Sequence, residues 1–134
     1  MLPVSRQWLA AAVAAALTLG LGVGIATAQQ PGREQRCGWF DNPSPGNAWL
    51  HDKDGRWTVA IQGDYQAEGD WPPVYKTGEL RRQGNGNYGY GCACLTVKVD
   101  AAEKKILEIF SSKGQSLATC RKDRALSTVE KRLR

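Results

Sequence analysis

The sequence predicts a mainly β protein, built as a small antiparallel sheet or partly open barrel with disulfides and a short C-terminal helix. Two turn signals, Asp54-Gly55 and Asn85-Gly86, each adjoin runs rich in β-forming residues. Four cysteines in a chain with an export pattern favour cross-links over a large core. Leu126, Val129 and Leu133 are spaced three and four apart, which is helical spacing.

Residues 1–28 have the pattern of a secretory signal peptide. A positive charge at Arg6 precedes an apolar stretch from Trp8 to Ile25, and the small residues Ala26-Thr27-Ala28 form a cleavage site. The alternative, an uncleaved membrane anchor, is disfavoured because the stretch is rich in alanine and glycine. We therefore expect a periplasmic or secreted bacterial protein without stable membrane insertion after cleavage.

The remainder predicts one domain with short polar ends. Residues 29–36 are polar and contain Pro31 and Gly32, so we expect a flexible leader. Residues 37–126 form the predicted disulfide-stapled β domain, and residues 127–134 a basic C-terminal helix or tail. The formal net charge is +5, but outside the signal its excess lies after Cys120. A basic tail on a neutral body does not suit duplex binding, so no nucleic-acid partner is expected.

The predicted elements follow turn chemistry and alternation. Residues 41–47 contain two prolines and a glycine and are expected to form a loop. Residues 48–61 predict a hairpin that turns at 52–55, and a second loop is expected over 63–73. A second hairpin, 79–92, turns at Asn85-Gly86, and its return strand continues to Val99. A turn over 100–105 leads to a strand over 106–110, and residues 124–134 predict a short amphipathic helix.

The four cysteines predict two structural disulfides. A bond between Cys92 and Cys94 would close a strained ring, so Cys37 and Cys120 each bond one of these two, in either order. If 92–99 is a strand, the two cysteines share one face and Ala93, Leu95, Val97 and Val99 the other, toward the core. A thiolate metal site or a redox pair fits the spacing less well, so no metal and no cofactor are expected.

Three further motifs are better explained by structure. Gly84-Asn85-Gly86-Asn87-Tyr88-Gly89 matches a dinucleotide pattern, but a strand follows it where that motif needs a helix. Asp52-x-Asp54-Gly55 begins like a calcium loop, but Ile61 stands where the required glutamate belongs. His51 is the only histidine and lies beside a predicted turn. No catalytic residue is assigned from these motifs.

Aromatic residues give the best functional lead. Rings with neighbouring amides and carboxylates suit stacking on sugars or extended peptides. The candidate binding residues are Trp39, Trp49, Trp71, Tyr88 and Tyr90. The alternative is a small cell-envelope hydrolase that uses Glu68 and Asp70 as paired carboxylates.

Long strings of this sequence resemble a family of small exported bacterial proteins known as domain of unknown function 4087. The strings are Cys37-Gly38-Trp39-Phe40-Asp41-Asn42-Pro43-Ser44-Pro45-Gly46-Asn47-Ala48-Trp49-Leu50, Gln66-Ala67-Glu68-Gly69, Tyr88-Gly89-Tyr90-Gly91-Cys92-Ala93-Cys94-Leu95 and Cys120-Arg121-Lys122-Asp123. The resemblance implies an extracytoplasmic, cysteine-bearing single domain and supplies no activity. The aromatic residues favour a non-catalytic binding or interaction module for a cell-wall glycan, a peptide or an envelope-protein partner.

Overall fold

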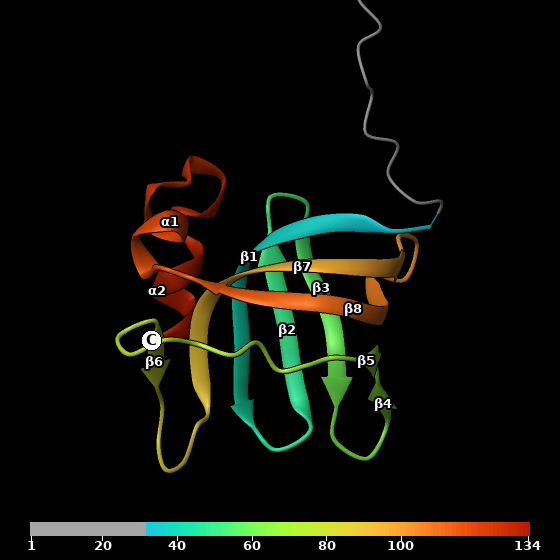
Figure 1. The fold of residues 1–134 in the computed structure, drawn as a ribbon, viewed down its shortest axis with the longest axis horizontal. Coiled ribbons are helices and arrows are strands. Elements are labelled where there is room, and N and C mark those ends of the chain that lie inside the picture. The colour runs from blue at the N-terminus through green and yellow to red at the C-terminus, as the bar shows by residue number, and fades with distance from the viewer. Residues whose placement is uncertain (1–31) are drawn as a thin grey trace, which may run out of the picture.

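Five long strands form a partly closed ring in the computed structural model, which describes residues 32–134. These strands are β1 (Glu34–Ser44), β2 (Asn47–Asp52), β3 (Gly55–Ile61), β7 (Gly89–Asp100) and β8 (Lys105–Gln115). They pair in the order β3-β2-β1-β7-β8, and a parallel contact between β3 and β8 closes the ring (Figure 1). A barrel architecture by itself assigns no function. The predicted mainly β, partly open barrel is confirmed, although the sheet is mixed and not wholly antiparallel.

The ring closes at one point, where the β7–β8 turn meets β3. The Thr58 N–H donates to the Lys104 carbonyl at 2.8 Å, and the Lys104 ammonium donates to the Asp54 carbonyl at 2.9 Å. The same ammonium lies 4.4 Å from the centre of the Trp57 ring. The turn after β7, which the sequence predicted over 100–105, therefore positions the residue that seals the barrel.

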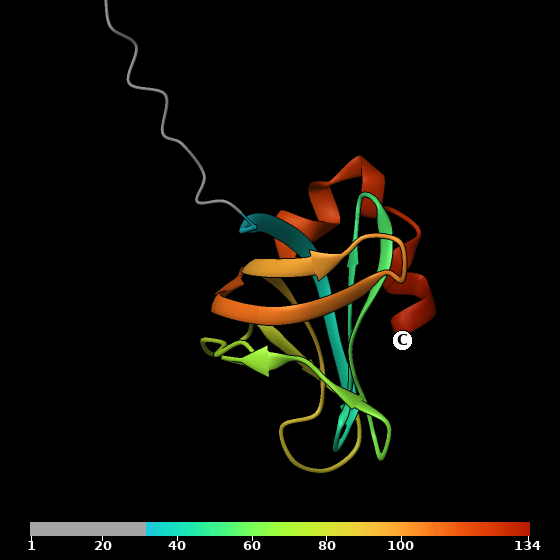
Figure 2. The same cartoon turned by 90° about the vertical axis from the view of Figure 1, so that its right-hand side faces the viewer.

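Three short strands and three short helices pack around this ring. The strands β4 (Tyr65–Gln66), β5 (Glu68–Gly69) and β6 (Leu80–Arg82) pair with β3, β8 and β7 respectively. After β8 the chain forms the helices α1 (Leu117–Lys122), η1 (Arg124–Leu126) and α2 (Val129–Leu133). We call residues 117–133 the C-terminal cap. Figure 2 shows the cap on one side of β1 and the chain around β5 on the other.

Two apolar clusters lie on opposite faces of β1 and β7, because successive strand residues point in opposite directions. Trp39 and Phe40 are neighbours in β1, and their exposed fractions are only 0% and 1%. The Phe40 side belongs to the barrel core, with Leu50, Trp57, Val59, Leu95, Val97, Ile106 and Ile109. The Trp39 side belongs to the helix-side cluster, with Tyr90, Cys92, Cys120, Leu126, Val129 and Leu133.

Both predicted disulfides are present, and the structure decides their order. Cys37 bonds to Cys94, directly opposite in the β1–β7 register, across a sequence separation of 57 residues. Cys92 bonds to Cys120 of α1, across 28 residues. The predicted faces of β7 are confirmed, since Ala93, Leu95 and Val97 lie in the barrel core.

The loop predicted over residues 41–47 is wrong. β1 continues to Ser44, and only Pro45-Gly46 turns the chain into β2. The β1–β2 register shifts between Asp41 and Ser44, and Pro43 has no register partner there. Because a bulge leaves a residue outside the ladder, a proline at this position removes no hydrogen bond from the sheet.

The chain ends of the domain also differ from the prediction. β1 begins at Glu34, inside the segment that was predicted to be a flexible leader. Arg36, in the same segment, donates to the Asp52 carboxylate at 2.6 Å, and its guanidinium lies 3.8 Å from the centre of the Trp57 ring. The single helix predicted over 124–134 is replaced by η1 and α2, and α1 precedes them. Asp123 interrupts the helices with an extended backbone and caps η1, accepting from the Ala125 N–H at 2.9 Å.

The predicted signal peptide and most of the predicted leader lie outside the described residues. Between residues 32 and 134, no helix has the length and apolar character needed to cross a membrane. The predicted apolar spacing at the C-terminus is confirmed by packing, since Leu126, Val129 and Leu133 are all buried in the helix-side cluster.

Candidate functional site

The segment between β5 and β6 crosses one side of the barrel (Figure 1). We call its residues 71–79 the strap. At its start Trp71 packs against the barrel core, and Pro73 is buried. The Trp71–Pro72 peptide bond is cis. In contrast, Val74 has an exposed fraction of 86%, the highest of the large apolar residues in the described chain.

Tyr75 holds the strap against the sheet by packing on two glycines. A Cβ atom at Gly91 would lie 2.5 Å from Cε1 of the Tyr75 ring, and one at Gly114 would lie 2.8 Å from Cδ1. Only glycine at these two positions lets the ring approach β7 and β8 so closely. Burial, with the negative charge of Glu79, raises the pKa of Tyr75 far above its usual value, so the hydroxyl stays protonated.

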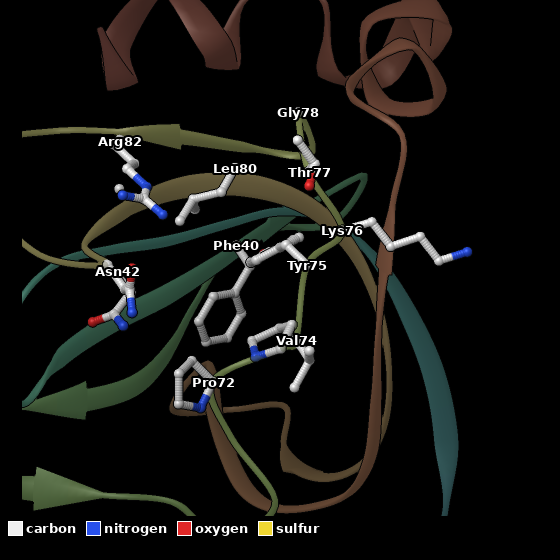
Figure 3. Close-up of a pocket in the computed structure, with 13 residues that line it drawn as sticks. Phe40, Asn42, Pro72, Val74, Tyr75, Lys76, Thr77, Gly78, Leu80 and Arg82 are labelled. Carbon is white, nitrogen blue, oxygen red and sulfur yellow. The ribbon is translucent and has the colours of Figure 1, made fainter.

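A pocket of about 710 Å³ lies between the strap, β6 and the end of the barrel (Figure 3). Its apolar lining residues are Phe40, Pro72, Pro73, Val74, Tyr75 and Leu80. Its polar side chains are Asn42, Lys76, Thr77, Arg82 and Asn87. Figure 3 shows Asn42 and Arg82 on one side of the Phe40 ring, Pro72 and Val74 on another, and the Lys76 ammonium pointing away.

This lining offers both apolar and polar contacts to a ligand. The apolar side chains can cover a hydrophobic group, while the Asn42 amide and the Arg82 guanidinium can bond an adjacent oxygen. No aspartate, glutamate or histidine lines the pocket. The pocket therefore lacks the paired acid and base that hydrolysis of a glycosidic bond requires.

Two of the predicted binding residues are buried. Trp39 and Tyr90 have exposed fractions of 0% and 3%, and their rings meet edge to face at 5.5 Å between centroids. Both point from the sheet into the helix-side cluster, where the C-terminal cap covers them. The sequence alternation could not reveal this, because residues on both faces of β1 and β7 are buried.

The other three predicted binding residues are half-buried and do not line the pocket. Trp49 lies on β2 with the Arg56 guanidinium 5.7 Å from its ring centre. Trp71 begins the strap, and Tyr88 follows Asn87 of the pocket. Sequence reasoning missed the strap residues themselves, although an apolar Val74 after two prolines in a loop was an available signal.

The two carboxylates of the hydrolase alternative also lie away from the pocket. Glu68 and Asp70 are exposed, at β5 and just after it, and neither is a lining residue. The Asp70 N–H donates to the Ile109 carbonyl at 2.9 Å, which ties the chain to β8. Their position supports a structural role at the sheet edge.

The helix side of the sheet contains a second group of titratable residues. Burial raises the pKa of Asp41 to about 6. Burial, followed by the positive charges of Arg56 and Arg132, lowers the pKa of His51 to about 4. Register places Asp41 opposite Trp49 and His51 opposite Trp39, so the two are diagonal neighbours on one face. No hydrogen bond joins them in the described structure, and the predicted position of His51 on a strand is confirmed.

Metal binding has no support from the side chains within 32–134. No three of their histidine, cysteine, aspartate and glutamate residues are grouped to hold an ion. All four cysteines are consumed by the disulfides. The four cysteines therefore form cross-links, and none of them is left as a thiolate ligand for a metal ion.

Fold and pocket together define a small disulfide-bonded β-barrel domain with a capped face and an open pocket. The chain belongs to the family described as protein of unknown function (DUF4087), whose model matches residues 32–127. No curated protein matches the chain. No solved structure matches it either.

Proposed function

We propose that this protein is a non-catalytic binding module of the bacterial cell envelope or the extracellular space, with its ligand in the pocket beneath the strap. One observation carries the proposal. The pocket joins an apolar surface, with the buried Phe40 and the exposed Val74 among its residues, to the amide of Asn42 and the guanidinium of Arg82. Such a lining recognises a ligand with an apolar part and a neighbouring oxygen-bearing group.

The way the strap is anchored supports a preformed site. Tyr75 is fixed on Gly91 and Gly114, and the Lys76 N–H donates to the Glu79 carboxylate at 2.8 Å. A pocket whose wall is already ordered loses less conformational entropy when a ligand binds. The exposed Val74 then gives the ligand an apolar contact at the rim.

The disulfides support the proposed compartment. Such bonds persist in oxidising environments and are rare in the cytoplasm. Two of them in a domain of this size agree with export, as does the predicted signal over residues 1–28. The hydrolase alternative gains no support, because Glu68 and Asp70 lie outside the pocket.

The proposal is tested by nuclear magnetic resonance on the oxidised protein labelled with nitrogen-15. Soluble chito-oligosaccharides and short capped peptides serve as probes at millimolar concentration. We expect at least one probe class to shift the amide signals of Asn42, Val74 and Asn87, and Val74→Asp to abolish these shifts.

Ile61→Asp is the matched control, since Ile61 is the other large apolar residue that is exposed within residues 32–134, and it lies outside the pocket. It should leave the shifts unchanged. If no probe of either class moves the signals of the pocket residues, or if both variants act alike, the pocket is not the binding site.

A further inference from the structure

β6 is an edge strand. Within residues 32–134 it pairs only with β7, through Leu80 with Gly91, Arg81 with Tyr90 and Arg82 with Gly89. Edge strands present a row of backbone donors and acceptors to an incoming strand. Most edge strands in folded proteins are protected against pairing with another chain by charges, bulges or a covering segment. The residues around β6 therefore decide whether it can pair with an added strand.

The hydrogen-bond pattern identifies which backbone groups of β6 face outward. The Gln83 N–H donates to the Tyr88 carbonyl at 2.9 Å, so these opposed residues form a hydrogen-bonded pair. Bonded and non-bonded pairs alternate along an antiparallel ladder. Arg81 is therefore bonded to Tyr90, while the backbone N–H and C=O groups of Leu80 and Arg82 point away from β7.

The side chains of β6 border two pockets. Leu80 and Arg82 line the pocket beneath the strap. Arg81 and Gln83, which alternate with them, line a second pocket of about 510 Å³ together with Tyr90 and Arg134, and Leu80 and Arg82 border this second pocket as well. A strand laid beside β6 would direct its alternate side chains toward these two pockets, since side chains alternate along a strand.

The second pocket has an excess of positive charge. Three arginines line it, namely Arg81, Arg82 and Arg134, and no acidic residue does. Of these arginines, Arg134 lies 3.5 Å from the carboxylate of Glu130. That carboxylate already accepts hydrogen bonds from the Arg121 guanidinium at 2.7 Å and from the Tyr90 hydroxyl at 3.1 Å. Guanidinium groups without a full carboxylate complement recognise acidic side chains.

We propose that the free edge of β6 binds an extended acidic peptide segment of a partner protein as an added β-strand. This inference deepens the proposed function and rests on it. Backbone groups of the peptide bond Leu80 and Arg82, one set of its side chains fills the pocket beneath the strap, and the other set places carboxylates on Arg81 and Arg134. Strand addition with alternate side chains in pockets is an established mode of peptide recognition.

Charge complementarity favours such a peptide over a second copy of this chain. Two β6 strands paired edge to edge would bring Arg81 and Arg82 close to the same arginines of the other copy. Like charges that face each other across a strand pair are destabilising. A segment with glutamate or aspartate at alternate positions reverses the sign of that interaction.

Calorimetry on the oxidised full-length mature protein tests the charge requirement. The probes are a short capped peptide that alternates valine and glutamate, and a matched peptide with lysine in place of glutamate. The glutamate peptide should bind and weaken as salt is added, and the lysine peptide should not bind. Arg81→Ala should reduce the affinity by about tenfold or more, which is the scale of one charged hydrogen bond. Equal binding of both peptides overturns the inference.

Backbone methylation of the peptide tests strand addition without altering the protein. In an added strand only every second peptide N–H faces β6. Two glutamate peptides are compared, each N-methylated at one of the two alternating sets of positions. One set should lose binding and the other should retain it. Equal effects of the two sets overturn strand addition.

A pair of variants at residue 82 gives the same test from the protein side. Arg82→Ala removes the side chain, and Arg82→Pro removes in addition the outward N–H, which makes no bond to β7. The proline variant should bind the peptide about tenfold more weakly than the alanine variant, while its amide at Arg81 keeps its protection from exchange. Equal affinities contradict the inference.

The two proposals fail in different ways. In one outcome, a chito-oligosaccharide or an uncharged peptide shifts the amide signals of the pocket residues, Val74→Asp abolishes these shifts, and the glutamate peptide does not bind. The proposed function then stands, and the proposal of an acidic peptide strand on β6 is wrong. If neither probe class affects the pocket, both proposals fall.

Discussion

The C-terminal cap and the strap both cover the sheet, but they are held by different means. The cap is tied to β7 by the Cys92–Cys120 disulfide and buries Leu126, Val129 and Leu133 against Trp39. The strap has no covalent tie and depends on the Tyr75 ring, which packs on Gly91 and Gly114. Beneath the cap the apolar side chains pack together in the helix-side cluster, whereas the strap borders a pocket of about 710 Å³.

This difference suggests that the cap mainly stabilises the fold, whereas the strap borders the site that we propose for binding. A segment with three buried apolar side chains and a cross-link excludes water and ligand alike. The strap is held by non-covalent contacts of Trp71, Pro73 and the Tyr75 ring, and Val74 between them stays exposed. The strap side is therefore where we propose that a ligand binds, whereas the cap buries the helix-side cluster.

The largest expected effect comes from removing the covalent tie of the cap. Cys92→Ala with Cys120→Ala should lower the free energy of unfolding by about 3–4 kcal/mol, because the bond joins residues that are 28 apart and so restrains the unfolded chain. Amide exchange over residues 117–133 should increase. In the control pair, Cys37→Ala with Cys94→Ala, the cap should keep its protection, since those cysteines join two strands that are already paired. Unchanged protection of the cap in the first pair would contradict this account.

A substitution that lifts the strap should have the next largest effect. Gly91→Ala places a Cβ atom 2.5 Å from the Tyr75 ring, so we expect a loss of about 1–3 kcal/mol in denaturant unfolding. In a Tyr75→Ala background the same substitution should cost much less, because the clash with the ring is gone and only the 3.0 Å approach to the Glu79 carbonyl oxygen remains. Additive losses would show that Tyr75 does not anchor the strap.

The ion pair inside the cap should give a smaller, pH-dependent effect. The hydrogen bond from Arg121 lowers the pKa of Glu130 from 4.5 to about 2, against a smaller contribution from burial. A carboxyl with a lowered folded pKa contributes stability above its unfolded value, and this contribution is lost as the pH falls from about 4.5 toward 2. Glu130→Gln should cost about 1–2 kcal/mol at pH 7 and reduce the loss on acidification. A parallel pH profile for variant and wild type would refute the assignment.

The smallest expected effect comes from the hydroxyl of the strap anchor. The Tyr75 hydroxyl is buried and has no hydrogen-bond partner in the described structure. Tyr75→Phe keeps the ring and removes an unsatisfied group, so the melting temperature should stay level or rise, with a gain below about 1 kcal/mol. A clear loss of stability would mean that the hydroxyl is satisfied, and would weaken the view that the strap is held by ring packing alone.

Short-range chemistry made several elements predictable. The turns at Asp54-Gly55 and Asn85-Gly86 both connect the expected strand pairs, β2 with β3 and β6 with β7. The faces of β7 followed from alternation and placed Leu95 and Val97 in the core. The proline-containing end of β1 was missed because its bulge depends on the partners of β1, not on its own residues.

The candidate site was much less predictable. Aromatic residues alone could not separate Trp39, which lies under the cap, from Trp71, which begins the strap. The pocket forms because Tyr75 meets Gly91 and Gly114, which lie far along the chain from it. No local pattern in the strap records that contact.

The sequence by itself determined the β class, the main turns and the faces of β7, since each depends on residues close together in the chain. The presence of two cross-links followed from the four cysteines and the export pattern. Tertiary structure alone decided which cysteines bond, where Lys104 closes the ring on β3, and which aromatic rings are buried. These outcomes depend on pairings between distant segments, and such pairings are fixed only when the strands close into a barrel and both of its faces are covered.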